Sequence, residues 1–173
     1  MPELIKREIK FDGPMFRVSR DTWGSQPPLV RDVVHHNGSV AMCVIEDNDV
    51  DFNKAEIYLV RQYRYGVEDW CLELPAGTID PEEDSSDALV RECEEELGLK
   101  PHSYQLLQEI YPSPGFLSER IWLYRVNIWE KTEQRLDVGE ELDIVKITIG
   151  EVKDMIQAGA IKDAKTIVGV MLL

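Results

Sequence analysis

The amino-acid sequence predicts an α/β fold of the mixed (α+β) kind, with one main core and a small β extension at the amino terminus. Its 173 residues suit one domain, and a hydrophobic content of 43% is enough to bury a sizeable core. Strand-like and helical segments are interspersed along the chain, without the regular strand–helix alternation that indicates a doubly wound parallel sheet.

The amino-terminal segment predicts a hairpin. Residues 3–20 alternate apolar and polar residues on both sides of a Gly-Pro turn, and the stretch WGSQPP at 23–28 has the composition of a linker. We therefore expect residues 1–30 to form the extension and residues 31–173 to form the main domain. The extension has unpaired strand edges and apolar residues, so we expect it to pair with another surface. These apolar residues are Ile9, Phe11, Phe16 and Val18.

The main domain is expected to combine seven strands with three helices. Strands are predicted where apolar runs are bounded by turn-rich segments, and helices where apolar residues recur three or four positions apart. The expected strands are 31–36, 39–46, 55–64, 69–74, 104–111, 120–129 and 143–148, and the expected helices are 82–97, 150–158 and 163–172.

Charge and composition disfavour several classes of protein. A formal net charge of −14 disfavours nucleic acid or an anionic membrane as partner. No apolar run approaches the ~18 residues of a membrane span, and the amino terminus lacks the apolar core of a signal peptide. Three cysteines without C-x-x-C spacing are expected to be reduced and mostly packed. We therefore expect a cytoplasmic protein that needs cations if its substrate is anionic.

The segment from Asp80 to Glu96 is unusual in its charge, because it carries nine carboxylates and a single base, Arg91. Its start predicts a helix in which Asp80 is the cap, Pro81 lies in the first turn and Glu83 completes a capping box. Gly98 then predicts the end of the helix.

Three carboxylates of this helix are predicted to lie together. On a helical wheel of ~100° per residue, the apolar side chains share one arc and Glu92, Glu95 and Glu96 share the neighbouring arc. Spacings of three and four residues bring those carboxylates within ~6 Å of each other. Two interpretations stay open: a solvated acidic face, or ligands for a hard cation such as Mg²⁺ or Mn²⁺. A backbone carbonyl of Ala76 or Gly77, just before the helix, could add an oxygen ligand.

The same residues resemble a known family motif. Gly77, then five residues, Glu83, then seven residues, and the run RECEEELGL at 91–99 match every fixed position of the Nudix box, G-x5-E-x7-R-E-U-x-E-E-x-G-U. Cys93 stands at the first apolar position, where a buried thiol is an acceptable small hydrophobe. The chain is therefore similar to Nudix hydrolases.

The resemblance implies a fold, the Nudix-type α/β/α sandwich with a mixed sheet. It also implies an activity: the enzyme would use a divalent metal to hydrolyse a nucleoside diphosphate that is linked to another group. It implies that Glu92, Glu95 and Glu96 bind Mg²⁺ (or Mn²⁺), together with the Ala76 carbonyl, and that Arg91 orients the glutamates. Outside the box, VRQYR, SPGFLSER with Pro114, GEELDIV and the tail GAIKDAKTIVGVMLL resemble the branch of ADP-ribose and nucleotide-sugar pyrophosphatases. GDP-mannose or other nucleotide sugars, and a non-catalytic sensor of such a ligand, are the alternatives.

The branch resemblance also implies roles outside the box. Arg64 would bind a phosphate, whereas Arg61 is equally compatible with a surface role. The loop before the last strand would supply the general base, and we favour Glu141 over Glu140. Two further roles are implied. Glu119 would bind the metal or the terminal ribose, and Trp23 would stack on the base from an extension exchanged across a homodimer; ordinary surface and packing roles are the respective alternatives.

Overall fold

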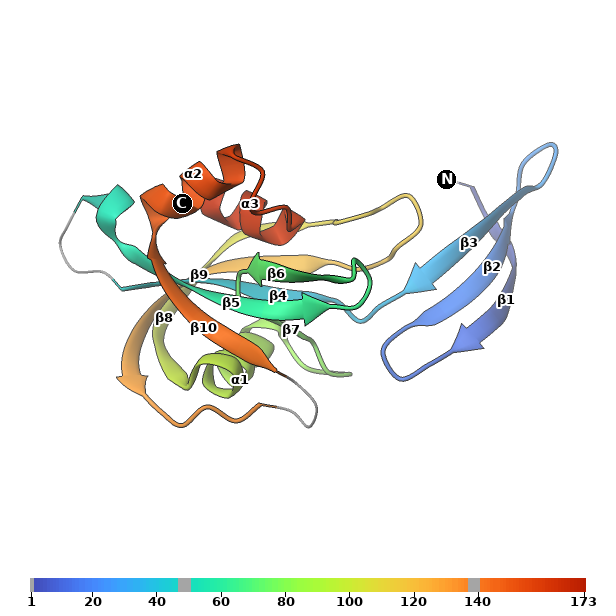
Figure 1. The fold of residues 1–173 in the computed structure, drawn as a ribbon. Coiled ribbons are helices and arrows are strands. Elements are labelled where there is room, and N and C mark those ends of the chain that lie inside the picture. The colour runs from blue at the N-terminus through green and yellow to red at the C-terminus, as the bar shows by residue number, and fades with distance from the viewer. Residues whose placement is uncertain (1, 47–50, 137–140) are drawn as a thin grey trace.

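The computed structural model describes residues 2–46, 51–136 and 141–173. Two sheets are present in this part of the chain (Figure 1). The first is a small antiparallel sheet of β1 (Leu4–Asp12), β2 (Arg17–Trp23) and β3 (Leu29–His35). The second is a mixed sheet of seven strands that is covered by helices on both faces, which confirms the predicted α/β/α sandwich.

The main sheet has the order β10-β5-β4-β9-β8, with β6 pairing with β5 and β7 pairing with β4. The pair β4–β9 is parallel and the other pairs are antiparallel. The bounds of these strands are β4 Ser39–Glu46, β5 Glu56–Arg64, β6 Asp69–Glu73, β7 Ala76–Thr78, β8 Leu99–Ile110, β9 Ile121–Lys131 and β10 Leu142–Thr148.

Helices cover the two faces of the main sheet unequally (Figure 1). Helix α1 (Ser85–Leu97) lies on one face, and α2 (Ile149–Gln157) and α3 (Ala164–Met171) lie on the other. A short 3-10 helix, η1 (Phe52–Lys54), precedes β5. None of the helices in the described ranges is long and apolar enough to cross a membrane.

The central strand β4 is buried on both faces, which explains why its sequence is a continuous apolar run. Because side chains alternate along a strand, Val40, Met42 and Val44 pack toward α1, whereas Cys43 and Ile45 pack toward α2 and α3. On the first face the strand residues meet the apolar stripe of α1, namely Ala88, Leu89, Cys93 and Leu97. Burial raises the pKa of the Cys43 and Cys93 thiols to about 12, in agreement with packed, reduced cysteines.

Helix α1 begins three residues later than predicted. Asp84, not Asp80, is its N-terminal flanking residue, and Pro81 lies in a turn outside the helix. Glu83 accepts a hydrogen bond from the Asp80 backbone N–H at 2.9 Å, as a capping box would require, but this bond closes the turn instead. The reason is Glu82, whose φ of 69° takes the backbone off the helical path.

Two strands also differ from the sequence-based expectation. The run at 31–36 was expected in the main domain, yet β3 begins at Leu29 and pairs with β2, so the small sheet continues to His35. Strand β8 begins at Leu99 and not at 104. It tolerates Pro101 because β8 lies at the edge of the sheet and its pairing with β9 is irregular at that point.

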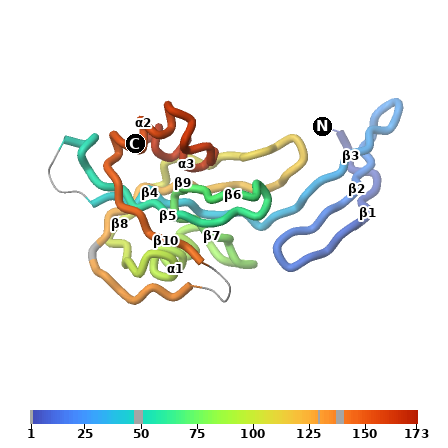
Figure 2. The backbone as a smooth tube through the Cα atoms, viewed as in Figure 1, coloured from blue at the N-terminus to red at the C-terminus, as the bar shows by residue number. Residues whose placement is uncertain are grey.

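The small sheet touches the main domain only through its last strand among the contacts described. The Val34 N–H donates to Phe116 O at 2.7 Å, and the Ser118 N–H donates to Val34 O at 2.9 Å. The rest of the sheet stands away from the main domain (Figures 1 and 2). It carries many exposed apolar side chains, which are Leu4, Ile5, Ile9, Phe11, Met15, Phe16, Leu29 and Val30.

Candidate active site

The box residues are organised around the guanidinium group of Arg91. This group donates two hydrogen bonds to Glu83, at 3.0 and 2.9 Å, and one each to Glu92 at 2.7 Å and Glu95 at 3.1 Å. A further bond, at 2.9 Å, reaches the Thr78 carbonyl in β7. The bond to Glu83 is the largest cause of the raised pKa of Arg91, and it lowers the pKa of Glu83 in return. Arg91 therefore ties α1 to the strand and the loop that precede it.

Glu92 and Glu96 extend from the same side of α1 toward two consecutive residues of β7. Glu96 is 3% exposed and accepts a hydrogen bond from the Ala76 N–H at 3.0 Å. The Glu92 carboxylate lies against the Cα of Gly77, where an added Cβ would come within 1.8 Å of its carboxyl carbon. An added side chain at this position would therefore displace the Glu92 carboxylate.

The donor set fits a hard divalent cation in its chemistry. Glu92, Glu95, Glu96 and the carbonyl of Ala76 offer oxygen atoms only, which Mg²⁺ prefers. In the described residues, however, no three acidic, histidine or cysteine side chains are close enough together to hold an ion as they stand. Arg91 holds Glu92 and Glu95 with its own hydrogen bonds. A cation would thus complete its ligand set only as these side chains turn away from Arg91.

The segment after β9 binds the last turn of α1. The Arg135 N–H donates to Glu95 O at 2.9 Å, the Gln134 side chain to Glu96 O at 2.7 Å, and the Thr132 N–H to Gly98 O at 2.6 Å. Figure 2 shows this part of the chain, coloured orange, passing α1. These bonds satisfy carbonyl groups that a helix end leaves without intrahelical partners. The segment 132–135 therefore holds the end of α1 that carries two of the box glutamates.

Arg64 is placed beside the box but is already engaged. Its guanidinium binds the buried Glu73 with two hydrogen bonds, at 2.7 and 2.9 Å, and Lys165 of α3 binds the same carboxylate. Burial alone would raise the pKa of Glu73, but these two cations outweigh it and the pKa is lowered. Glu96 is among the charges that raise the pKa of Arg64, after Glu73 and Asp163, so Arg64 lies within electrostatic reach of the box.

Glu141 lies in a separate cavity of about 350 Å³, lined also by Trp70, Leu136, Leu142 and Asp143. No contact joins Glu141 to the box carboxylates in the described part of the chain, and Glu140 lies outside the described residues. Arg61 stacks over the Trp70 ring at 4.4 Å and lies 3.7 Å from Asp143. Arg61 therefore contacts residues that line the cavity of Glu141, whereas Arg64 binds Glu73.

Two other predicted residues lie farther from the box. Glu119 accepts a hydrogen bond from the Ser39 hydroxyl at 2.6 Å and lies 3.8 Å from His36. Since Ser39 pairs with Thr78 of β7, Glu119 is near the strand that receives Glu92 and Glu96. Trp23 is the last residue of β2 in the small sheet and is not brought to the box within one chain.

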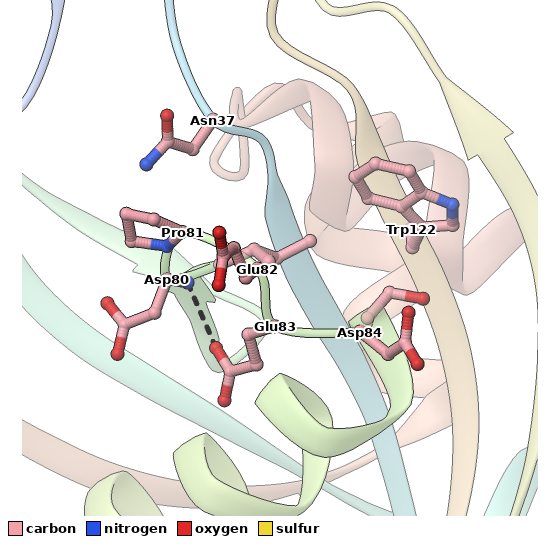
Figure 3. Close-up of a pocket in the computed structure, with 9 residues that line it drawn as sticks. Asn37, Asp80, Pro81, Glu82, Glu83, Asp84 and Trp122 are labelled. Atoms are coloured by element: carbon pink, nitrogen blue, oxygen red, sulfur yellow. Dashed lines mark hydrogen bonds between the residues drawn. The ribbon is translucent and has the colours of Figure 1, made fainter.

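A cavity of about 360 Å³ opens at the other end of α1 (Figure 3). The picture shows Trp122 and Asn37 on one side and the turn before α1 on the other, with the Asp80–Glu83 hydrogen bond dashed. Its lining holds four carboxylates and no basic side chain: Asp80, Glu82, Glu83 and Asp84. Such a lining disfavours an anionic ligand, so we place the candidate active site at the Glu92–Glu96 side of α1.

Sequence reasoning missed several residues of this region. Glu73 and Lys165 were overlooked because a buried ion pair between β6 and α3 depends on packing across 92 residues of sequence. Trp70 was not singled out either, although it lines the same cavity as Glu141. Arg135 had no local pattern that would mark it.

Comparison with known proteins identifies the family of the chain. The NUDIX domain model matches residues 36–167, and the chain belongs to that family. The box residues identified above therefore stand in a Nudix hydrolase fold, and the predicted resemblance is confirmed.

Several relatives match nearly the whole chain, among them a GDP-mannose pyrophosphatase from Enterobacter that is 30% identical over 185 residues, with 96% of this chain and 91% of that protein covered. A methanol dehydrogenase activator from Bacillus methanolicus is 34% identical over 175 residues, which are 99% of this chain and 91% of that protein. An ADP-ribose pyrophosphatase from Mycobacterium tuberculosis is 31% identical over 176 residues, with 98% and 81% covered. The solved structure of an ADP compounds hydrolase has the same fold, with a TM-score of 0.76 at 20% identity over 99% of this chain and 91% of that chain.

Gly98 allows the segment 132–135 to approach the end of α1, which yields a test of this packing. Gly98 has a φ of +60°, and an added Cβ would lie 2.8 Å from Gln134 N and 2.9 Å from Thr132 O, both backbone atoms. We expect Gly98→Ala to lower the free energy of unfolding by about 1–3 kcal/mol, measured by urea denaturation. Gly159→Ala is the matched control, since Gly159 is also left-handed with a φ of +73° but its Cβ would meet nothing within 4 Å, so it should lower the free energy of unfolding less than Gly98→Ala does. Equal effects of both changes would contradict the packing.

Proposed function

We propose that this protein is a Mg²⁺-dependent pyrophosphatase that hydrolyses ADP-ribose or a related nucleoside diphosphate sugar to a nucleoside monophosphate and a sugar phosphate. The observation that carries the proposal is the convergence of Glu92 and Glu96 on two consecutive residues, Ala76 and Gly77, with Arg91 holding the frame. Similarity to an ADP-ribose pyrophosphatase over 98% of the chain supports the substrate class.

Glu92, Glu95, Glu96 and the carbonyl of Ala76 are the residues that would hold Mg²⁺. The ion, when bound, supplies positive charge to the oxygens of the pyrophosphate. Such charge is needed, because the substrate must approach a chain with a net charge of −14. In this arrangement Arg91 positions the glutamates, and the turn that Glu83 closes keeps Arg91 in place.

The remaining roles concern the substrate. Arg64 would turn part of its guanidinium from Glu73 to a phosphate, while Lys165 continues to neutralise Glu73. Glu119, near β7, would bind the metal or the terminal ribose. Arg61 lies next to Glu141 and would contact the substrate only on that side of the site.

Product analysis by chromatography tests the reaction itself. The purified protein is incubated with ADP-ribose, GDP-mannose, ADP-glucose and FAD, each with Mg²⁺ and with EDTA. We expect AMP and ribose 5-phosphate from ADP-ribose, formed only with metal. Faster cleavage of another sugar nucleotide would keep the chemistry and change the substrate. Absence of all cleavage by folded protein would refute the catalytic proposal and favour a sensor of such ligands.

Removing one ligand charge tests the metal site. Glu96→Gln has nearly the same volume, and its amide oxygen can still accept the Ala76 N–H, so the fold should be retained. Loss of a residue that only hydrogen-bonds to a metal ligand can lower activity by up to about 10²-fold. We expect Glu96→Gln, which changes a ligand itself, to lower turnover by more than that. Asp154→Asn, an exposed position on α2, removes the same charge and should leave turnover unchanged. A Glu96→Gln enzyme with near-parental rate would exclude Glu96 as a ligand.

The general base is assigned to the segment before β10, with Glu141 preferred to Glu140. A carboxylate there would accept the proton of the attacking water. We expect Glu141→Gln to lower kcat by about 10²–10⁴-fold, the range for loss of a general base, and to remove the acidic limb of the kcat–pH profile. An unchanged kcat would move the role to Glu140 or Glu119.

The exposed apolar surface of the small sheet supports the proposal that the protein is a homodimer. Its exposed apolar side chains, Ile5 at 62% and Ile9 at 47% among them, belong to a three-stranded sheet that no helix or second sheet of the described residues covers. Such a surface marks a protein–protein contact when it is this extensive. A second copy that exchanges this sheet would also bring the partner subunit's Trp23 toward the base of the substrate, where an indole ring can stack.

Light scattering after size-exclusion chromatography tests the homodimer. The parent chain of 19.9 kDa is expected to elute at about twice that mass, because burying the apolar face favours association. The double variant Ile5→Asp, Ile9→Asp should shift the mass to that of one chain. Met171→Asp, also exposed but on α3, serves as the control and should remain dimeric. A parent protein of single-chain mass at micromolar concentration would overturn the assignment.

A further inference from the structure

Arg135, beside the candidate active site, has a guanidinium group that none of the described residues binds. Within residues 2–46, 51–136 and 141–173, the Arg135 side chain makes no hydrogen bond or ion pair. The arginines already assigned differ in this respect. Arg91 binds three glutamates, Arg64 binds Glu73 with two hydrogen bonds, and Arg61 stacks on an indole ring. Arg135 is therefore available to an anion without first losing a carboxylate partner.

The backbone of Arg135 is nevertheless fixed. Its N–H donates to Glu95 O at 2.9 Å, and the preceding residue, Gln134, donates to Glu96 O at 2.7 Å. Both acceptors belong to residues whose side chains are the proposed metal ligands. Arg135 thus has a set position next to the end of α1, while its exposed side chain is free to turn.

The space in front of Arg135 is a cavity of about 280 Å³. It is lined by Arg91, Glu94, Glu95, Thr132, Glu133 and Arg135. Glu95 thus borders the same cavity as Arg135, which places the free cation beside a proposed metal ligand. The three carboxylates of the lining would repel a phosphate group unless cations offset them. Arg91 is committed to the box glutamates, so Arg135 is the remaining basic group of the lining.

We propose that Arg135 is a substrate-binding residue that donates hydrogen bonds to the pyrophosphate group. The planar guanidinium presents two N–H donors that match two oxygens of one phosphate, and such charge-assisted pairs are stronger than neutral ones. The inference rests on the proposed function, since it names the phosphate as the ligand. It also links substrate binding to the segment that leads to Glu141, six residues farther along the chain.

Steady-state kinetics with ADP-ribose and Mg²⁺ test the assignment on three variants. Arg135→Ala should raise KM by about 10- to 100-fold, the loss expected for a charge-assisted hydrogen bond, and change kcat by less than about threefold. Arg135→Lys should recover only part of the loss, because an ammonium group cannot bind two oxygens in a fixed fork. Added salt should raise KM of the parent enzyme more than that of Arg135→Ala. Lys54→Ala, an exposed cation on η1, controls for net charge and should match the parent.

Calorimetric titration with ADP in the presence of Mg²⁺ separates this inference from the proposed function. Arg135→Ala keeps the backbone bond to Glu95, so it should unfold at the parent's urea midpoint yet bind ADP about 10-fold more weakly or worse. If the parent cleaves ADP-ribose, but KM and ADP affinity are the same in Arg135→Ala, only the role of Arg135 is wrong. If the parent cleaves nothing but loses ADP affinity with the substitution, Arg135 stands and the catalytic proposal fails. If the parent neither cleaves nor binds, both are refuted.

Discussion

The guanidinium of Arg91 is the interaction on which the site depends. A single helix carries Glu92, Glu94, Glu95 and Glu96 in succession, and like charges at these spacings repel each other. Arg91 offsets this repulsion from inside the cluster, and it does so with five hydrogen bonds that join the helix, the turn before it and β7. Without that cation, the repulsion of Glu92 and Glu95 by their neighbouring carboxylates would have no counterion within the cluster. The arrangement is thus a cluster of carboxylates with its own internal counterion.

The surrounding chain supports this cluster from two directions. From one side, β7 receives Glu92 and Glu96, and its pairing with the fully buried β4 fixes its position in the sheet. From the other, the segment 132–135 binds the free carbonyls at the end of α1. Because the segment 132–135 binds backbone carbonyl groups of α1 and of Gly98, it constrains the helix end without using any of the helix's carboxylates. The side chains are left to interact with a cation and a substrate.

A second charge cluster lies on the neighbouring strands. Glu73 is buried, and it is kept ionised by Arg64 and Lys165, which come from β5 and from the start of α3. Because Glu73 has two cationic partners, Lys165 would still neutralise its charge if Arg64 turned toward another anion. Arg64 and Arg135 approach the box from different elements, the first from β5 and the second from the segment after β9.

The sequence by itself determined the elements and the chemistry of the helix. The apolar run of β4, the helical spacing of Leu89, Cys93 and Leu97, and the box pattern are local signals, and each corresponds to a contact seen in the fold. Only the tertiary structure decided which cations are free. Arg64 and Arg135 look alike in sequence, but a buried Glu73 engages the first and no described residue engages the second. Likewise, β3 belongs to the small sheet and not to the main domain, because its pairing with β2, and not its apolar content, determines its sheet. Partners far apart along the chain set these outcomes, and local pattern carries no information about them.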